Sequence, residues 1–213
     1  MVYFVRNRIT FNRFLFMTAG DHAAFLRAVN DAAEHAPMRV IAFCMLLQEW
    51  SLVLWPHADG DMARFMHRLT TTHAARWNAC HMSLGDGHLY HDRYRSFPIQ
   101  TGTPILTICR YVEQGGARAG YTERPENWRW SSAGYRPNDR DDPVMVLDPG
   151  PTPRPDDWES LLASPLTPET LADVEACAKR GRPYGDLIWR ERVARELGVE
   201  STLRSPGRPR KAK

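Results

Sequence analysis

The 213-residue chain lacks long apolar runs and has few cysteines, and both features narrow its class. No stretch of about eighteen apolar residues is present, and the first residues show no charged and then apolar leader, so we expect neither a membrane-spanning nor a secreted protein. The 4 cysteines lie far apart with no Cys-x-x-Cys spacing, which excludes a cysteine zinc site and is typical of reduced thiols. We therefore expect a cytoplasmic protein. Because 43% of the residues are hydrophobic, the chain can bury a core.

Charge is distributed unevenly along the chain, although the net charge is only +3. Residues 1–137 carry 15 basic and 11 acidic side chains, residues 138–178 carry 2 and 10, and residues 179–213 carry 11 and 4. The last block is basic enough to seek a polyanion such as a nucleic acid. The acidic block is a candidate occupant of a basic groove when no ligand is bound.

Hydrophobic periodicity predicts alternating strands and helices before residue 136. We expect strands or extended segments at 3–10, 38–46, 49–55 and 88–99, and helices at 21–35, from Asp59 or Asp61 to Trp77, and at 103–114. Asp21 is the expected N-cap of the first helix, and Pro37 is expected to end it. This order indicates an α+β fold, an antiparallel sheet with helices packed on one face.

The composition changes after Tyr135. Eight of the 16 prolines fall between residues 137 and 168, among aspartates, which favours a linker with little fixed structure. We divide the chain into a domain, an acidic proline-rich linker and a basic helical C-terminal extension, at residues 1–136, 137–167 and 168–213. Within the extension we expect helices at about 168–178 and about 186–197.

Two Gly-Arg-Pro elements, at 180–183 and 207–211, dominate the basic extension. Extended arginine-rich segments of this kind suit a DNA minor groove, where arginine responds to groove width and negative potential. The DNA-binding residues expected in the extension are Arg180, Arg182, Arg190, Arg208, Arg210 and Lys211. The alternative interpretation is a solvated tail that only promotes solubility.

A second mixture of cationic and aromatic side chains lies in the middle of the chain, as on surfaces that bind single-stranded nucleic acid. We expect Arg93 and Arg95 to contact phosphates. Trp128 and Trp130 either stack on bases or hold the end of the domain against its sheet, and the sequence leaves both interpretations open.

Four segments of the chain carry a resemblance to a known family. They are Gly87-His88-Leu89-Tyr90-His91-Asp92-Arg93-Tyr94-Arg95-Ser96-Phe97-Pro98, Leu52-Val53-Leu54-Trp55-Pro56 with Asp59-Gly60-Asp61, Cys109-Arg110-Tyr111-Val112-Glu113, and Trp128-Arg129-Trp130-Ser131-Ser132. In this order they resemble the REP-associated tyrosine transposases, which are relatives of the IS200/IS605 transposases. The two Gly-Arg-Pro elements also match, so the resemblance covers roughly residues 3–135 and 178–211.

The resemblance implies a ferredoxin-like sheet with helices and binding of imperfect palindromic DNA hairpins. It also implies cleavage of a single strand by a tyrosine that attacks a phosphodiester and stays attached to the 5′ phosphate. In this family a divalent ion, held by a histidine-hydrophobic-histidine strand, polarises the phosphate, because a phenol is a poor nucleophile near neutral pH. Members of the wider group form dimers, so a homodimer is a further expectation.

The sequence departs from the family pattern at the metal site. Aligning residues 52–56 with the family strand puts Glu49 and Ser51 at the two histidine positions, while Tyr111 matches the nucleophile. Gly115-Gly116 replaces a polar residue near the metal and a proline. We therefore expect no cofactor, and Mg²⁺ or Mn²⁺ would be needed only if cleavage were retained. Without the metal, Tyr111 is expected to serve in packing or DNA stacking.

Histidines offer a weaker alternative metal site. His88 and His91 are three residues apart and could combine with His73 or His81. We do not favour this site, because His88 belongs to the family segment and histidines in loops are common.

One function and two alternatives follow from the sequence. The expected function is a DNA-binding protein derived from REP-associated tyrosine transposases, which recognises hairpin or single-stranded palindromic DNA after losing strand cleavage. Such a protein is expected to be nucleoid-associated. The first alternative is an active transposase or nickase that forms a 5′-phosphotyrosine DNA intermediate through Tyr111 with a divalent metal. The second is a protein-interaction scaffold whose tail binds DNA non-specifically.

Overall fold

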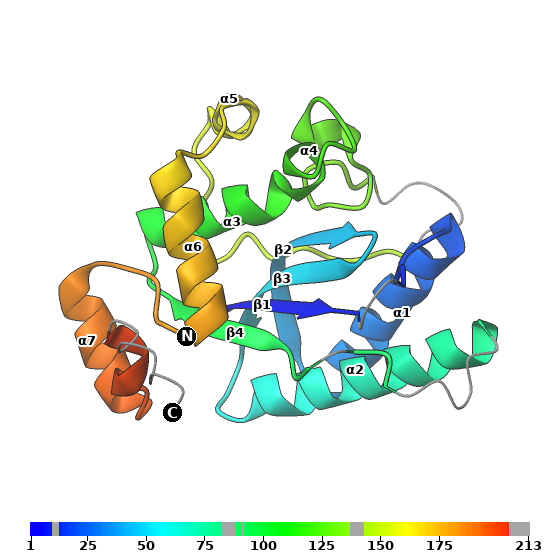
Figure 1. The fold of residues 1–213 in the computed structure, drawn as a ribbon, viewed down its shortest axis with the longest axis horizontal. Helices are drawn as coiled ribbons and strands as arrows, with labels where there is room; N and C mark the ends of the chain where they lie inside the picture. The colour runs from blue at the N-terminus through cyan, green and yellow to red at the C-terminus, as the bar shows by residue number, and fades with distance from the viewer. Residues whose placement is uncertain (10–12, 82–87, 91, 137–142, 205–213) are drawn as a thin grey trace, which may run out of the picture.

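The first half of the chain forms a β-α-β-β-α-β unit, and helices follow it (Figure 1). The structure, a computed structural model, describes residues 1–9, 13–81, 88–90, 92–136 and 143–204. The unit comprises β1 (Val2–Arg8), α1 (Ala19–His35), β2 (Met38–Leu46), β3 (Glu49–Pro56), α2 (Asp61–Cys80) and β4 (Arg95–Ile99). The later elements are α3 (Thr103–Glu113), α4 (Gly115–Arg118), η1 (Pro125–Asn127), α5 (Trp158–Ala163), α6 (Pro168–Arg180), α7 (Leu187–Glu196) and η2 (Glu200–Leu203).

The four strands form one antiparallel sheet in the order β2-β3-β1-β4. This order and the two crossover helices make the unit ferredoxin-like, and the predicted α+β class is confirmed. The expected extended stretch at 88–99 is a strand only from Arg95, and the second helix begins at Asp61, after Gly60 in a left-handed conformation with φ 83°.

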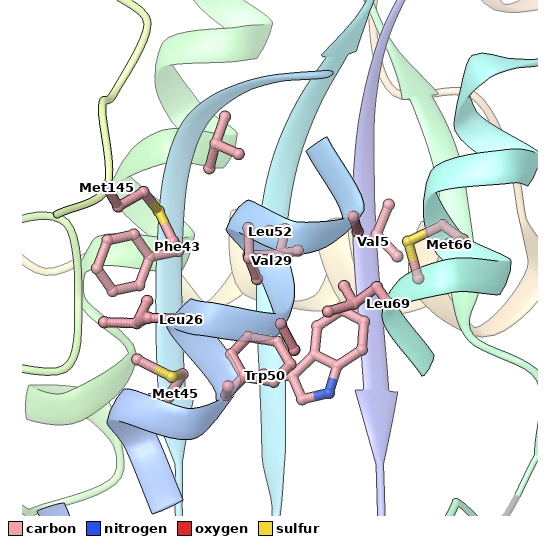
Figure 2. Packing of buried hydrophobic residues seen from close by; sticks show 14 of the residues in the cluster. Val5, Leu26, Val29, Phe43, Met45, Trp50, Leu52, Met66, Leu69 and Met145 are labelled. Carbon is pink, nitrogen blue, oxygen red and sulfur yellow. The ribbon is translucent and has the colours of Figure 1, made fainter. Parts of the chain in front are cut away.

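Helices α1 and α2 cover one face of the sheet (Figure 1). The buried tryptophans Trp50, Trp77 and Trp130 belong to the core on this face. Trp50 of β3 is completely buried there, among Leu26 of α1, Leu69 of α2 and Met45 of β2 (Figure 2). Thr18, not Asp21, is the N-cap of α1. Asp21 is the third residue of the helix, and its carboxylate accepts a hydrogen bond from the Thr18 N–H at 2.8 Å in a capping box.

Helices α3 and α6 cover the opposite face (Figure 1). The expectation of helices on one face therefore holds for α1 and α2, and a second helical layer adds to it. The physical reason is strand alternation: Val5 of β1 points toward α1 and α2, while Phe4 points the other way and packs with Phe97 and Ile108. A sheet with two apolar faces needs a cover on each.

Residues 143–167 make specific contacts with the body, unlike a linker with little fixed structure. Met145 is buried beside Phe43 in the first core (Figure 2), and the Asp148 N–H donates to the Val40 carbonyl at 2.8 Å. Prolines restrict the backbone of such a segment before folding, so the few apolar residues between them can dock at low entropic cost. The predicted helices at about 168–178 and 186–197 correspond to α6 and α7.

None of the helices in the described ranges is both long and apolar enough to cross a membrane. All four cysteines are free thiols. Burial raises the pKa of Cys44 and of Cys109 to about 12, so both remain protonated and unreactive near neutral pH.

Candidate nucleic-acid interface

Three arginines form a row across β1 and β4, next to the two family metal positions. In the strand register Arg6 lies opposite Ser51 of β3 on one side and opposite Arg95 of β4 on the other. Arg8 lies opposite Glu49, and its Nη2 is 2.6 Å from the Glu49 carboxylate. Because alternate residues of a strand share a face, this arginine row (Arg6, Arg8 and Arg95) lies on the face that α3 and α6 cover.

Tyr111 projects from α3 onto the same face and is only 4% exposed. Its hydroxyl donates a hydrogen bond to the carboxylate of Glu175 on α6. Arg6 donates to the Tyr111 oxygen at 3.3 Å and to both oxygens of Glu175 at 2.9 Å. The Arg118 guanidinium lies 4.1 Å above the centre of the Tyr111 ring. The phenol is therefore enclosed by a carboxylate and two guanidinium groups.

These contacts keep the phenol protonated. Burial and the hydrogen bond to Glu175 raise the pKa of Tyr111 to about 12, although Arg6 and Arg118 act in the opposite direction. Burial also acts to raise the pKa of Glu175, but the hydrogen bonds from Arg6 and Tyr111 outweigh it and lower that pKa. Near neutral pH the site thus holds a neutral tyrosine, a charged carboxylate and charged arginines.

The residues at the family metal positions do not fit a divalent ion. The only carboxylate there, Glu49, is already paired with Arg8. Ser51 offers a neutral hydroxyl that is 8% exposed, and its cross-strand neighbour Cys44 stays a thiol. Within the described part of the chain, no three His, Cys, Asp or Glu side chains group so as to hold a metal ion. We therefore assign no metal-dependent step to this site.

Gly115 and Gly116 lie where neighbouring side chains leave no room for a Cβ atom. A Cβ on Gly115 would lie 2.7 Å from the Cys44 sulfur, and one on Gly116 would lie 2.3 Å from the Trp128 ring. A larger residue at either position would force α4 away from β2 and Trp128. Close packing therefore requires glycine at both positions.

The arginines predicted to bind phosphate in the body lie at an exposed edge. Arg93 is exposed, and the Arg95 side chain is 53% exposed, although it contacts Asp92 at 3.7 Å. Arg95 also donates to the Lys179 carbonyl at 3.0 Å, at the end of α6. The arginine row therefore runs from Arg6, which lies beneath α6, to Arg95, which is exposed to solvent.

The structure gives the predicted arginines of the extension different surroundings. Arg182 and Arg190 both bind Asp173 of α6, and their side chains are about one-fifth exposed. Arg180 donates to the Arg204 carbonyl. The first Gly-Arg-Pro element is therefore folded against α6 and β4, with Tyr184 paired to Ile99, instead of being a free extended arm. Arg208, Arg210 and Lys211 lie outside the described residues.

The tryptophans of the middle segment hold the chain against the sheet. Trp128 donates from Nε1 to the Met45 carbonyl at 2.9 Å, and the Met45 N–H donates to the Trp130 carbonyl at 2.8 Å. Trp130 is 7% exposed and stacks on His22 with ring centres 4.1 Å apart. Of the two interpretations of this pair, the structure places Trp130 in the packing role.

Two of the histidines considered as metal ligands, His73 and His81, have different partners. His73 is buried and bonded to the Tyr90 hydroxyl at 2.6 Å. His81 bonds through Nδ1 to the Trp77 carbonyl and lies 3.3 Å from Asp21 through Nε2. His91 lies outside the described residues.

Sequence reasoning did not identify four residues that surround Tyr111 and Glu49. Arg6 and Arg8 carried a usable signal, because two arginines two residues apart on a predicted strand share one face. Arg118 and Glu175 carried none, since their approach to Tyr111 depends on how α4 and α6 fold back.

A comparison with solved structures places this geometry in a known fold. The structure of a REP-associated tyrosine transposase bound to a REP hairpin superimposes with a TM-score of 0.54 at 12% sequence identity, covering 72% of this chain and 91% of that chain. The chain has the fold of a REP-associated tyrosine transposase. In this transposase fold, Ser51 and Tyr111 of the present chain both border the arginine row.

A second structure, that of a candidate transposase from Deinococcus radiodurans R1, matches with a TM-score of 0.41 at 15% identity and covers 54% of this chain and 89% of that one. No protein-family model matches the sequence, and no curated protein matches it.

Proposed function

We propose that this protein binds hairpin or single-stranded palindromic DNA and does not cut it. The observation that carries the proposal is the site at Tyr111. The residue at the family nucleophile position is neutral and bound by Glu175, and Arg6 and Arg118 lie beside it. The likeness in fold to a transposase bound to a REP hairpin supports DNA as the partner.

The arginine row supplies the phosphate-binding chemistry. Arg6 and Arg95 are directly opposed on neighbouring strands, an arrangement that is unfavourable unless an anion lies between or beside them. In the free protein Glu175, which belongs to the acidic block, pairs with Arg6, and Glu49 of β3 pairs with Arg8. Phosphates of a bound strand would meet the guanidinium groups of Arg8 and Arg95, whose side chains are 66% and 53% exposed, and form charge-assisted bonds with them.

The test is incubation of the protein with a labelled DNA hairpin carrying single-stranded flanks, with Mg²⁺ or Mn²⁺. We expect a shifted band on a native gel and intact DNA on a denaturing gel. A covalent protein–DNA band that disappears with Tyr111→Phe would show an active nickase and overturn the proposal. No shift with any hairpin would leave the scaffold alternative.

Replacing Arg93 and Arg95 together by alanine should weaken hairpin binding about tenfold at moderate salt, because two phosphate contacts are lost. The slope of log K against log salt should become shallower by roughly 1.5. Fluorescence anisotropy across a salt series measures both quantities. Arg27→Ala is the matched control, since Arg27 is an exposed helical arginine on α1. Equal affinity of the double variant and the wild type at low salt would remove these two residues from the interface.

A further inference from the structure

We propose that the cleft between α2 and the segment leading into β4 binds one unstacked base of a DNA strand that the protein holds. This inference rests on the proposed DNA-binding function and adds to it a subsite that takes a base instead of a phosphate. The cleft has a volume of about 600 Å³, within the range of roughly 300–1,000 Å³ that is typical of small-molecule sites. It is lined by the end of β1, one face of α2 and residues 88–94.

Asn7 of β1 is a buried polar side chain that lines this cleft, with an exposed fraction of only 5%. Its Oδ1 accepts a hydrogen bond from the Arg8 N–H at 2.9 Å, so the backbone uses the carbonyl side of the amide. Within the described part of the chain, no group accepts a hydrogen bond from its Nδ2. A nearly buried N–H₂ group of this kind gains by donating to a ligand that fills the cleft and excludes water from it.

One face of α2 forms the first wall of the cleft and carries mostly short side chains. The residues on this face are Ala63, His67, Thr70, Thr71 and Ala74. Their spacing of mostly three and four residues puts them on one side of the helix. Because alanine and threonine side chains are short, they leave an open surface of the helix against which a flat ring can lie.

Residues 88–94 form the second wall and are anchored to the sheet. Tyr90 forms an antiparallel bridge with the residue that follows β1, and its hydroxyl is bonded to the ring nitrogens of Trp50 and His73. Tyr94 is half-buried, lines the cleft and packs against the first core. The wall is therefore formed before any ligand binds, and it offers the ring of Tyr94 for stacking.

The chemistry of the cleft suits a base better than a phosphate. The Asn7 N–H₂ group can donate to a ring nitrogen or a carbonyl oxygen on the edge of a base. Asp92 also lines the cleft, and its carboxylate would repel a phosphate there, although it lies 3.7 Å from Arg95. A base carries no charge to be repelled. Arg93, which is exposed and lines the same cleft, remains available for the phosphate of the bound nucleotide.

The cleft and the arginine row lie on opposite sides of β1. Asn7 is placed between Arg6 and Arg8 in the strand, so its side chain points to the other face of the sheet. The Arg8 side chain, at the end of β1, is 66% exposed. A DNA strand whose phosphates meet Arg8 and Arg93 would pass the end of β1, where one of its bases can turn into the cleft.

Removing single bases from the DNA tests the inference on the full-length protein. The probe is the labelled hairpin with single-stranded flanks that the wild type binds on a native gel, with one abasic residue at each unpaired position in turn. Every phosphate stays in place, so only contacts with a base are lost. We expect at least one position at which the abasic residue weakens wild-type binding about tenfold, measured by fluorescence anisotropy.

Two variants assign that position to the cleft. Asn7→Asp keeps an oxygen for the Arg8 N–H and removes the N–H₂ donor, while Ala63→Phe fills the cleft from an exposed helix position. Both should bind the intact hairpin about tenfold more weakly than the wild type and should lose no further affinity for the abasic hairpin. Ala79→Phe is the matched control, because Ala79 is an exposed alanine on the other side of α2. It should behave as the wild type with both probes.

The outcomes separate this inference from the proposed function. Binding of the intact hairpin without sensitivity to base removal at any unpaired position would overturn the base subsite and leave the DNA-binding function standing. Absence of binding to every hairpin would overturn both. A sensitive position whose abasic residue weakens Asn7→Asp and Ala63→Phe as much as the wild type would place the base elsewhere on the protein and contradict the inference.

Discussion

Lowering the pH from 7 to 5 should reduce the free energy of unfolding by about 2 kcal/mol through His73 alone. Burial lowers the pKa of His73 from its ordinary 6.5 to about 3, more than the nearby Asp21 raises it. Between pH 6.5 and 3, His73 is therefore protonated in the unfolded chain but stays neutral in the folded protein. The contribution of neutral His73 to stability is fully present above pH 6.5 and is lost as the pH falls toward 3. The loss in the free energy of unfolding is on the order of 3 kcal/mol at pH 4.

The hydrogen-bond chain through Tyr90 explains why His73 must remain neutral. The Trp50 Nε1–H can only donate, and it lies 3.1 Å from the Tyr90 oxygen. The Tyr90 proton is thus directed to Nδ1 of His73, 2.6 Å away, which must be an unprotonated acceptor. Protonating Nδ1 would place a donor against this donor inside the α1–α2 core, where Phe16 and Phe25 surround the ring.

Urea unfolding of the wild type and of His73→Phe at pH 7, 6, 5 and 4 measures this effect. His73→Phe should be less stable than the wild type at pH 7, because Tyr90 loses its acceptor, but the difference should shrink as the pH falls. Subtracting the two curves removes the contributions of carboxylates such as Glu113, which titrate in both proteins. Parallel curves would show that His73 is not the group responsible.

Replacing Glu113 by alanine should cost about 3 kcal/mol of stability, the loss expected when one partner of a buried charge pair is removed. Glu113, at the end of α3, is 1% exposed. It accepts hydrogen bonds from Arg154 at 2.5 Å, from Ser132 at 2.7 Å and from Trp158 at 3.0 Å. All three donors lose their acceptor together, and water has little access to replace it.

The loss of the Glu113 carboxylate should also destabilise one segment, residues 143–167, in addition to the whole domain. Burial raises the pKa of Glu113, although Arg154 and the hydrogen bonds from Ser132 and Trp158 oppose this. The carboxylate is the point where residues 154–158 dock onto α3, two residues from Tyr111. Without it, residues 143–167 should be cleaved by a protease at concentrations that leave the wild type intact.

Glu126→Ala is the matched control, since Glu126 forms a surface pair with Arg124, whose side chain is 65% exposed, and should cost at most about 1 kcal/mol. Denaturant unfolding with limited proteolysis measures both variants. Trp158→Phe, which keeps the ring and removes the N–H, combined with Glu113→Ala in a double-mutant cycle isolates that hydrogen bond. Equal stability of Glu113→Ala and Glu126→Ala would contradict the role assigned to Glu113.

The order of strands and helices was determined by the sequence alone, because it depends on local patterns. Alternating apolar residues in β3 and the helical spacing of Ile105, Ile108 and Val112 predicted their elements to within a few residues. The position of Tyr111 on α3 was also predicted from the sequence. The assignment of Glu49 and Ser51 to two histidine positions of the family stays a prediction, which depends on residue identity within one segment.

Only the tertiary structure decided what surrounds Tyr111 and where the acidic block lies. Glu175 is 64 residues from Tyr111 and 169 from Arg6 in the chain, so no local pattern could bring their side chains together. The packing of residues 143–167 against the body could likewise not be predicted from their many prolines and aspartates. It depends on a few contacts, such as the burial of Met145 and the hydrogen bond from Arg154 to buried Glu113. Local periodicity specifies elements, whereas long-range burial and charge pairing specify the site.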